Sequence, residues 1–138
     1  MATMTKAERN AFLAETRLGI LSTLDGRGDP VAVPVWFEWD GTDVRLFSFA
    51  NAPKVARLRN HPRASLLVVN HVHQKEGWVA FDGAVTISGD GVMPLAERLA
   101  ARYWDLGDPA RAKELALWRA MASRACVLTL RPERIRTS

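Results

Sequence analysis

The sequence predicts a mainly β domain with α-helices, in which six antiparallel strands form a barrel with flanking helices. Six runs of β-type residues occur along the chain, and turn-rich segments connect most of them as hairpins. A run of antiparallel strands in a small domain is best closed as a barrel, because closure removes exposed strand edges. With 138 residues, of which 48% are hydrophobic and 25% charged, the chain fits one domain, 1–138, that can bury a core.

The N-terminal part predicts one helix followed by three strands. Thr5 and Glu8 have the spacing of a capping box at the start of the helix. Alternating apolar residues indicate the strands, and residues 25–30 predict a hairpin because they are rich in turn residues. A phosphate-binding P-loop is disfavoured there, because its Lys-Ser/Thr pair and a following helix are missing. Pro34 requires an edge position, a bulge or a place where a ligand faces the backbone. The predicted elements are the helix Lys6–Glu15 and the strands Arg17–Leu24, Val31–Trp39 and Thr42–Ala50.

The central part predicts a short helix between two strands. Pro53 suits the first turn of a helix, where its missing N–H is not needed, and Pro62 forces the helix to end before it. Lys54 and Arg57 are three residues apart and share one helix face. The predicted elements are the helix Pro53–Asn60 and the strand Ala64–Asn70.

The C-terminal part predicts a strand, two helices and a final strand. Gly83 indicates a bulge in the first strand, and Pro132 is expected to end the last one. The helices show apolar residues at helical spacing and are separated by a Gly-Asp-Pro segment. The predicted elements are the strands Trp78–Ser88 and Arg124–Arg131 and the helices Val92–Leu106 and Ala110–Ser123.

The start of the central helix predicts an anion-binding site. Lys54 follows Pro53 directly, so an ammonium lies beside free backbone N–H groups and the positive end of the helix dipole. This combination suits a phosphate group. The alternative interpretation is a solvent-exposed basic helix that only connects two strands.

Composition argues against several classes of protein. No apolar run is long enough to cross a bilayer and the N-terminus lacks the apolar centre of a signal peptide, so we expect a cytoplasmic protein without a membrane partner. Cys126 is the only cysteine, which excludes an intrachain disulfide and a thiol metal cluster, and its strand predicts a buried, unreactive side chain. The net charge of +4 is dispersed without a dense Lys/Arg block, so no nucleic-acid partner is expected.

No set of side chains for protein-based catalysis is evident. His71 and His73 could form a metal-binding pair, but no third ligand is evident, and a solvated loop is the simpler interpretation, so no metal is predicted. A chain with a phosphate site but no acid–base set is either a binding protein or an enzyme whose cofactor carries the reaction. The aromatic residues that could line a slot for a flat ring, or belong to the core, are Trp36, Phe37, Trp39, Phe47, Phe49 and Trp78.

An ordered set of segments covers almost the whole chain. It includes Leu-Gly-Ile-Leu-Ser-Thr-Leu in the first strand, Val-Pro-Val-Trp-Phe in the second, Leu-Phe-Ser-Phe in the third and Gly-Trp-Val-Ala-Phe-Asp-Gly in the fifth. Its most specific piece is the Lys-x-x-x-Leu-x-x-x-Pro-x-Ala pattern within Lys54–Val69. In these segments the chain resembles the pyridoxamine 5′-phosphate oxidase-like superfamily of FMN-binding split barrels. It is most similar to the branch that uses the deazaflavin coenzyme F-420 in place of FMN.

This resemblance implies a homodimeric split β-barrel with two cofactor sites, each for FMN or coenzyme F-420, at the subunit interface. It implies that Lys54 contacts the cofactor phosphate and that Trp78 reaches the cofactor from the second subunit. Ala52-Pro53-Lys54 stands where the pyridoxamine phosphate oxidases carry Ser-Arg-Lys, so oxidation of vitamin B6 is not expected. The cofactor-binding residues expected from the resemblance and the helix are Val33, Pro34, Val35, Trp36, Phe47, Ser48, Phe49, Ala52, Pro53, Lys54, Arg57 and Trp78.

We therefore expect an oxidoreductase that transfers a hydride to or from a small organic substrate, with no side chain assigned as proton donor. Three alternatives remain open. The first is a non-catalytic flavin or deazaflavin carrier on the same fold. The second is a haem protein that uses His61, His71 or His73 as axial ligand. The third is an OB-like barrel that binds single-stranded nucleic acid through its aromatic residues.

Overall fold

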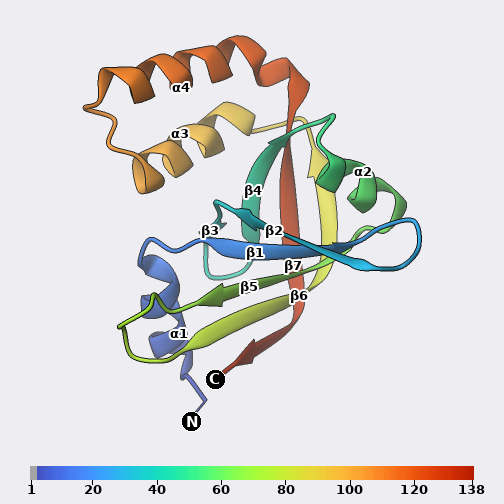
Figure 1. Ribbon diagram of the computed structural model, residues 1–138, viewed down its shortest axis with the longest axis vertical. Helices are drawn as coiled ribbons and strands as arrows, with labels where there is room; N and C mark the ends of the chain where they lie inside the picture. Colours follow the sequence, from blue (N-terminus) through green and yellow to red (C-terminus); the bar gives the residue numbers. More distant parts are fainter. Residues whose placement is uncertain (1–2) are drawn as a thin grey trace.

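The computed structural model describes residues 3–138, and within that range it shows four α-helices and seven strands (Figure 1). The strands form one antiparallel sheet, and the helices lie around it. The elements are α1 (Lys6–Ala14), β1 (Gly19–Leu24), β2 (Pro30–Val35), β3 (Glu38–Trp39), β4 (Val44–Phe49), α2 (Pro53–Asn60), β5 (Arg63–Val69), β6 (Trp78–Ser88), α3 (Val92–Tyr103), α4 (Pro109–Met121), the short 3₁₀ helix η1 (Ala122–Arg124) and β7 (Ala125–Thr137).

The sheet curls into a half-barrel whose two edges are consecutive strands. Its order is β2-β1-β5-β6-β7-β4-β3, so β2 and β3 lie at opposite edges and are joined only by Trp36 and Phe37. The predicted mainly β fold with helices is confirmed. The predicted single strand Val31–Trp39 is wrong, because the ring of Phe37 turns into the core, where it is 0% exposed, and the strand breaks there. The strand count is therefore seven rather than six. The sheet is open between its two edge strands, and we call the connection between them, Trp36-Phe37, the seam.

Pro34 lies in the edge strand β2, as its missing N–H requires. It is opposite Ile20 of β1, and in the part of the chain that the structure describes no strand pairs with its other side. Of the three alternatives that the sequence left open for Pro34, the structure shows the edge position. The open side of β2 leaves backbone and side chains beside the seam accessible to a ligand.

The pairing of β6 with β7 contains a β-bulge, and β7 is longer than the predicted strand. Gly83 lies opposite Pro132, whereas Asp82 lies opposite Arg134, so Glu133 is the extra residue. The predicted irregularity at Gly83 is confirmed, but the prediction that the last strand ends at Pro132 is wrong. The bulge allows the ladder to continue past the proline. Beyond it, Arg134 donates to Asp82 at 3.1 Å.

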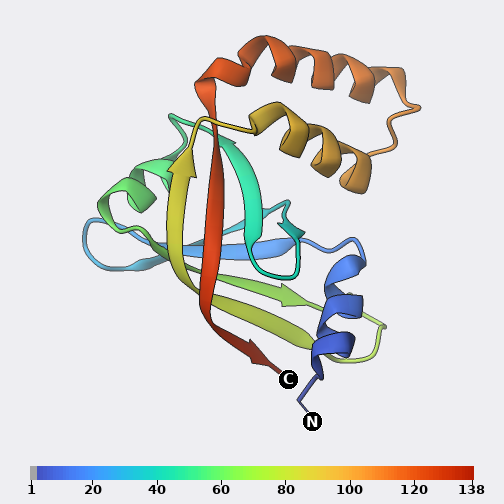
Figure 2. The ribbon, with the colours of Figure 1, turned by 180° about the vertical axis from the view of Figure 1, so that it is seen from behind.

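The helices cover the sheet at separate places (Figure 2). The predicted capping box of Thr5 and Glu8 is present in α1, which buries Leu13 in the main core. The α3–α4 hairpin lies at the end of the sheet where β7 begins, and it packs on β4 and β7 in a second apolar cluster. Arg102 of α3 donates to the backbone carbonyls of Leu13 and Glu15, which ties α3 to the end of α1. No helix in the described range has the length and apolar character needed to span a membrane.

Candidate functional site

A pocket of about 280 Å³ opens beside the seam. It collects side chains from β2 and the seam, from β4, from α2 and from the α3–α4 hairpin, which are far apart in the sequence. Five of the residues expected to bind a cofactor line it. The lining residues are Pro34, Val35, Trp36, Phe47, Lys54, Trp104 and Trp118.

The strands supply an apolar wall of this pocket. In β4 the burial alternates, so Leu46 and Ser48 face the main core side while Phe47 projects to the opposite face. There Phe47 packs against the cluster that holds the α3–α4 hairpin. The period of two along the strand therefore determines that Phe47, and not its neighbours, reaches the pocket.

Lys54 supplies the charge of the pocket. It lies in the first turn of α2, whose N-cap residue is Ala52 and so carries no side chain that could cap the free N–H groups. Burial and, secondly, the nearby Arg57 lower the pKa of Lys54 below its ordinary value. No acidic residue belongs to the described lining, so the ammonium is available to an anionic ligand.

Trp36 is the centre of an aromatic cluster that joins the seam to the hairpin. Its ring stacks on Tyr103, with the centroids 4.9 Å apart and the planes at 6°. Trp104 and Trp118 approach it at steep angles, with centroids 5.0 and 6.1 Å away. These contacts fix the position of the Trp36 indole at the mouth of the pocket.

The hydroxyl of Tyr103 holds the seam in place. It donates to the carbonyl of Arg17 at 2.5 Å and accepts from the N–H of Phe37 at 3.3 Å. The N–H of Phe37 lies between β2 and β3, where the ladder is interrupted, so a side chain must satisfy it. Tyr103 thus fixes both the stacked Trp36 and the backbone that carries it.

Several expected residues lie outside this pocket. Ser48 is buried, and its hydroxyl donates to the carbonyl of Phe49 at 3.2 Å. Phe49 lines a separate cavity of about 450 Å³ beside η1. The Nε of Arg57 donates to Thr23 Oγ1 at 2.7 Å, so the guanidinium faces β1 while Lys54 faces the pocket.

The remaining residues that were predicted to bind a cofactor also lie outside the pocket. Val33 and Ala52 are partly buried against the main core, and Pro53 is exposed in the first turn of α2. Trp78 begins β6, and its backbone N–H donates to Ser138 Oγ at 3.1 Å. Trp78 does not line the pocket. A contact of Trp78 with a cofactor therefore requires a second subunit, and it stays a prediction.

Trp104 and Trp118 were not expected in the site. Both lie in the helical region, where an aromatic residue at helical spacing indicates core packing. Trp118 follows the buried Leu115 by three residues and shares its helix face, and Trp104 is the C-cap residue of α3, so local spacing gives no signal that singles them out for the pocket. Only the folded hairpin brings the two indoles together at the pocket.

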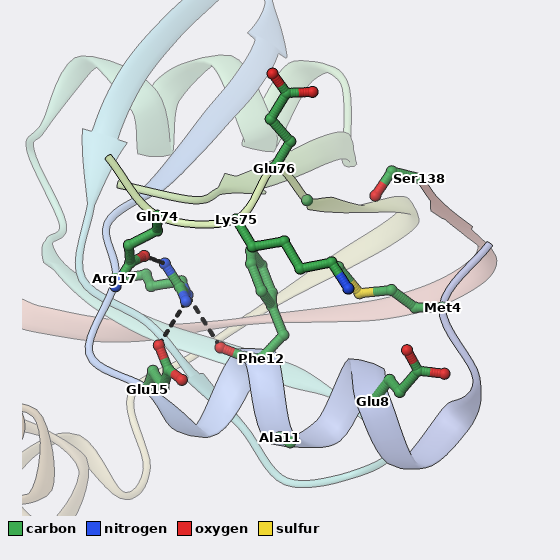
Figure 3. A pocket seen from close by; sticks show the side chains of 11 residues that line it. Met4, Glu8, Ala11, Phe12, Glu15, Arg17, Gln74, Lys75, Glu76 and Ser138 are labelled. Atoms are coloured by element: carbon green, nitrogen blue, oxygen red, sulfur yellow. Dashed lines mark hydrogen bonds and ion pairs between the residues drawn. The ribbon is translucent and has the colours of Figure 1, made fainter. Parts of the chain in front are cut away.

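A larger cavity of about 490 Å³ lies between α1 and the β5–β6 loop (Figure 3). Arg17 crosses its floor and donates to the Phe12 carbonyl, to Gln74 and to Glu15, as the dashed lines show. None of the expected cofactor residues lines it. Its charged side chains are of both signs and Arg17 is satisfied internally, so the smaller pocket, with its unpaired lysine, is the better candidate site.

The histidines lie away from this pocket as well. His71 Nε2 is 3.2 Å from the carbonyl oxygen of Thr16, and His61 and His73 are exposed. In residues 3–138 no group of three or more His, Cys, Asp or Glu side chains could hold a metal ion. Cys126 is buried, as predicted, and burial raises the pKa of its thiol.

Known proteins show similarity over the whole described fold. The family model described as pyridoxamine 5′-phosphate oxidase matches residues 5–138. A structure named F-420 reductase has a TM-score of 0.75 and 21% identity, with 92% of this chain and 94% of that chain covered. A conserved hypothetical protein from Mycobacterium tuberculosis has a TM-score of 0.79 and 22% identity, with 97% and 84% covered.

A third similar structure is an FAD-binding protein from Mesorhizobium loti. It has a TM-score of 0.69 and 22% identity, with 99% of this chain and 93% of that chain covered. Identities this low establish a common fold rather than a common ligand or reaction. A comparison with curated proteins gave no match.

Proposed function

This chain belongs to the pyridoxamine 5′-phosphate oxidase family, and we propose that it is a homodimeric oxidoreductase that binds FMN or coenzyme F-420. The observation that carries the proposal is the pocket in which Lys54, at the start of α2, lies with Pro34–Trp36 beside the seam. Proteins with this fold include one named F-420 reductase and one named FAD-binding protein, which supports a flavin or deazaflavin as the ligand.

The residues of the pocket fit such a cofactor. A half-buried ammonium at an uncapped helix start suits a phosphate, and the strand and aromatic walls suit a flat, largely apolar ring. The volume of about 280 Å³ is slightly below the range of about 300–1,000 Å³ usual for small-molecule sites. In a site shared between two subunits, the second subunit would enclose the rest of the cofactor.

The protein contributes binding and placement rather than acid–base catalysis. When bound, either cofactor supplies a ring that can give or take a hydride. Lys54 would hold the phosphate, and the backbone and side chains of Val33–Trp36 would orient the ring. Phe47 and Trp36 would keep water from the ring face. The substrate would be a small organic molecule next to the ring.

An apolar outer face of β1 and β5 supports the homodimer. Leu18, Leu67 and Val69 are 50%, 37% and 45% exposed on this face. Ile20 lies opposite Leu67 on one side and opposite Pro34 on the other, so the face continues to the pocket. A second copy of this chain on that face would cover the apolar side chains and complete the pocket.

Replacing Leu67 with aspartate is expected to convert the dimer into a monomer and to weaken cofactor binding by at least about tenfold, because a charge cannot be buried unpaired. Light scattering and fluorescence titration would measure the two effects. Val72→Asp is the matched control, since Val72 is 81% exposed in a loop. A Leu67→Asp protein that remains dimeric and binds normally would contradict this interface.

Titration of the purified protein with FMN and with coenzyme F-420, followed by fluorescence, tests the proposed function directly. We expect saturable binding of at least one cofactor at micromolar concentration. Single-turnover reaction of the reduced complex with candidate acceptors then separates an enzyme from a carrier. If the protein binds neither cofactor at micromolar concentration, the proposed function is wrong.

Lys54→Ala is expected to weaken cofactor binding by about 1–3 kcal/mol, because a charge-assisted contact with the phosphate is lost. The thermal unfolding of the free protein should change little, since Lys54 is not part of the core. Arg59→Ala is the control, because Arg59 is an exposed basic residue of the same helix. Equal losses of affinity in both variants would mean that the general charge of α2, and not Lys54, holds the ligand.

Cofactor affinity should also fall at alkaline pH. The phosphate contact needs the protonated ammonium, and its pKa in the free protein is lowered by burial and by Arg57. A bound phosphate raises the pKa again, so affinity is constant below the free-protein pKa and falls as the pH rises through it. Lys54→Arg should remove this decline, because a guanidinium stays protonated. Titrations between pH 7 and pH 10 check this, and an identical decline in both proteins would refute it.

A further inference from the structure

The cavity of about 490 Å³ between α1 and the β5–β6 loop is separate from the proposed cofactor pocket (Figure 3). In the described part of the chain the two cavities share no lining residue. The volume lies within the range of about 300–1,000 Å³ usual for small-molecule sites. The proposed function uses none of its side chains, so this cavity is available to a ligand of its own.

Arg17 holds the floor of this cavity in position. Its guanidinium lies over the Phe12 ring, 4.0 Å from the ring centroid. The Arg17 side chain is only 5% exposed, and it donates to the Phe12 carbonyl, to Gln74 and to Glu15. The charge of Arg17 is therefore compensated by Glu15 within the protein, and the Phe12 ring is fixed against the guanidinium.

Small residues keep the space above the Phe12 ring open. Ala11 of α1 is exposed at the cavity, and Gly77 ends the loop on the other side. A Cβ at Gly77 would lie 2.7 Å from Met4 Cε and 3.6 Å from Phe12 Cε2. Met4 and Phe12 thus reach the backbone of the loop, and together with Ala11 they form an apolar recess that suits a hydrocarbon group.

Two opposite charges line this recess without an ion-pair partner. Glu8 lies on α1, and Lys75 extends from the loop across the cavity (Figure 3). Neither takes part in an ion pair within residues 3–138. Hydrogen bonding with Thr5 and, less strongly, the charge of Lys75 lower the pKa of Glu8, so its carboxylate is ionised at neutral pH. Glu76 also lines the cavity, but its carboxylate points away from α1.

We propose that this cavity binds a zwitterionic amino acid with a large apolar side chain. The carboxylate of the ligand pairs with Lys75, its ammonium pairs with Glu8, and its side chain covers the Phe12 ring. A zwitterion satisfies both charges, whereas an ion of either sign leaves one of them without a partner and meets a like charge. This site does not depend on the proposed function.

Calorimetric titration of the cofactor-free protein with matched probes tests the charge requirement. L-Phenylalanine, phenethylamine and hydrocinnamate share one apolar body but carry both charges, only the ammonium or only the carboxylate. Glycine carries both charges without the apolar body. We expect L-phenylalanine to bind at least about tenfold more tightly than each of the other probes. Equal affinity for L-phenylalanine and a singly charged probe, or no saturable binding of L-phenylalanine at millimolar concentration, would overturn the inference.

Charge variants assign each contact. Lys75→Met should weaken L-phenylalanine about tenfold but should not weaken phenethylamine, which has no carboxylate. Glu8→Gln should weaken L-phenylalanine about tenfold but not hydrocinnamate, and glutamine keeps the capping box of α1. Lys6→Met is the control, because Lys6 is exposed on the same helix and does not line the cavity. An equal loss for all probes in either cavity variant would contradict the assigned pairs.

Ala11→Leu should abolish the binding of L-phenylalanine, because the larger side chain fills the recess. Ala7→Leu is the matched control, since Ala7 is exposed on the same helix and does not line the cavity. Both melting temperatures should stay close to that of the wild type, because both positions are exposed. Unchanged binding in Ala11→Leu would overturn the inference. If the protein binds L-phenylalanine but neither cofactor, the amino-acid site is supported and only the proposed function fails.

Discussion

Phe37→Ala is expected to lower the free energy of unfolding by about 3–5 kcal/mol. Phe37 is 0% exposed and belongs to the main core at the seam. Its ring packs close to Gly19, where an added Cβ would lie 3.1 Å from the Phe37 ring. Because a ring is lost from a site bounded by both sheet edges, the neighbouring side chains cannot fill the space without moving the seam.

Thermal and denaturant unfolding at one fixed protein concentration would measure this effect, since dimerisation makes apparent stability depend on concentration. Phe37→Leu keeps most of the side-chain volume and is expected to lower the free energy of unfolding by less than about 1.5 kcal/mol. The alanine variant should also lose cofactor binding, because Trp36 is the adjacent residue. Wild-type stability in Phe37→Ala would show that the seam does not depend on this ring.

Gly83→Ala is expected to destabilise the fold by about 3 kcal/mol, near the upper end of the range for forced overpacking. A Cβ at Gly83 would lie 2.1 Å from the carbonyl oxygen of Arg131 and 3.1 Å from the backbone N of Glu133. These are backbone atoms of the bulge in β7, so no side-chain rotation relieves the clash. We expect β7 to lose its pairing with β6 near Pro132, opposite the new methyl group.

Gly89→Ala is the matched control for this substitution. Within residues 3–138, and apart from its two chain neighbours, no atom lies within 4 Å of a Cβ added at Gly89, which follows the end of the same strand. Its melting temperature should stay close to that of the wild type, while that of Gly83→Ala should fall by roughly 10 °C. Similar melting temperatures for the two variants would show that β7 can shift away from Gly83 at little cost.

Local signals were sufficient for several elements. The helix Pro53–Asn60 and the strand Trp78–Ser88 have the predicted bounds, and the capping box that starts α1 is present. Proline in a first turn, a capping pair and period-two alternation act over a few residues, so they can be recognised without the rest of the fold. The missing N–H of Pro34 restricted it in the same way to an edge, a bulge or a ligand-facing position, and the structure shows the edge.

Other features depended on contacts between distant residues. The alternation of apolar residues predicts one continuous strand Val31–Trp39, and only the packed core shows that Phe37 turns inward and divides it. Pro132 predicts the end of the last strand, because the sequence indicates the bulge at Gly83 on β6 but not the extra residue opposite it on β7. Of the six aromatic residues considered for the site, only Trp36 and Phe47 line the pocket, whereas Phe37 and Trp39 pack in or against the core.

The amino-acid sequence predicts a β domain with a short helix whose first turn carries Lys54 after a strand. It does so because caps, prolines and alternation are local properties of the chain. Which aromatic residues share a pocket with that lysine depends instead on how distant elements pack. Trp104 and Trp118 reach it because the α3–α4 hairpin docks on β4 and β7, and Trp36 reaches it because the sheet opens there. Both depend on long-range packing, which no local pattern encodes.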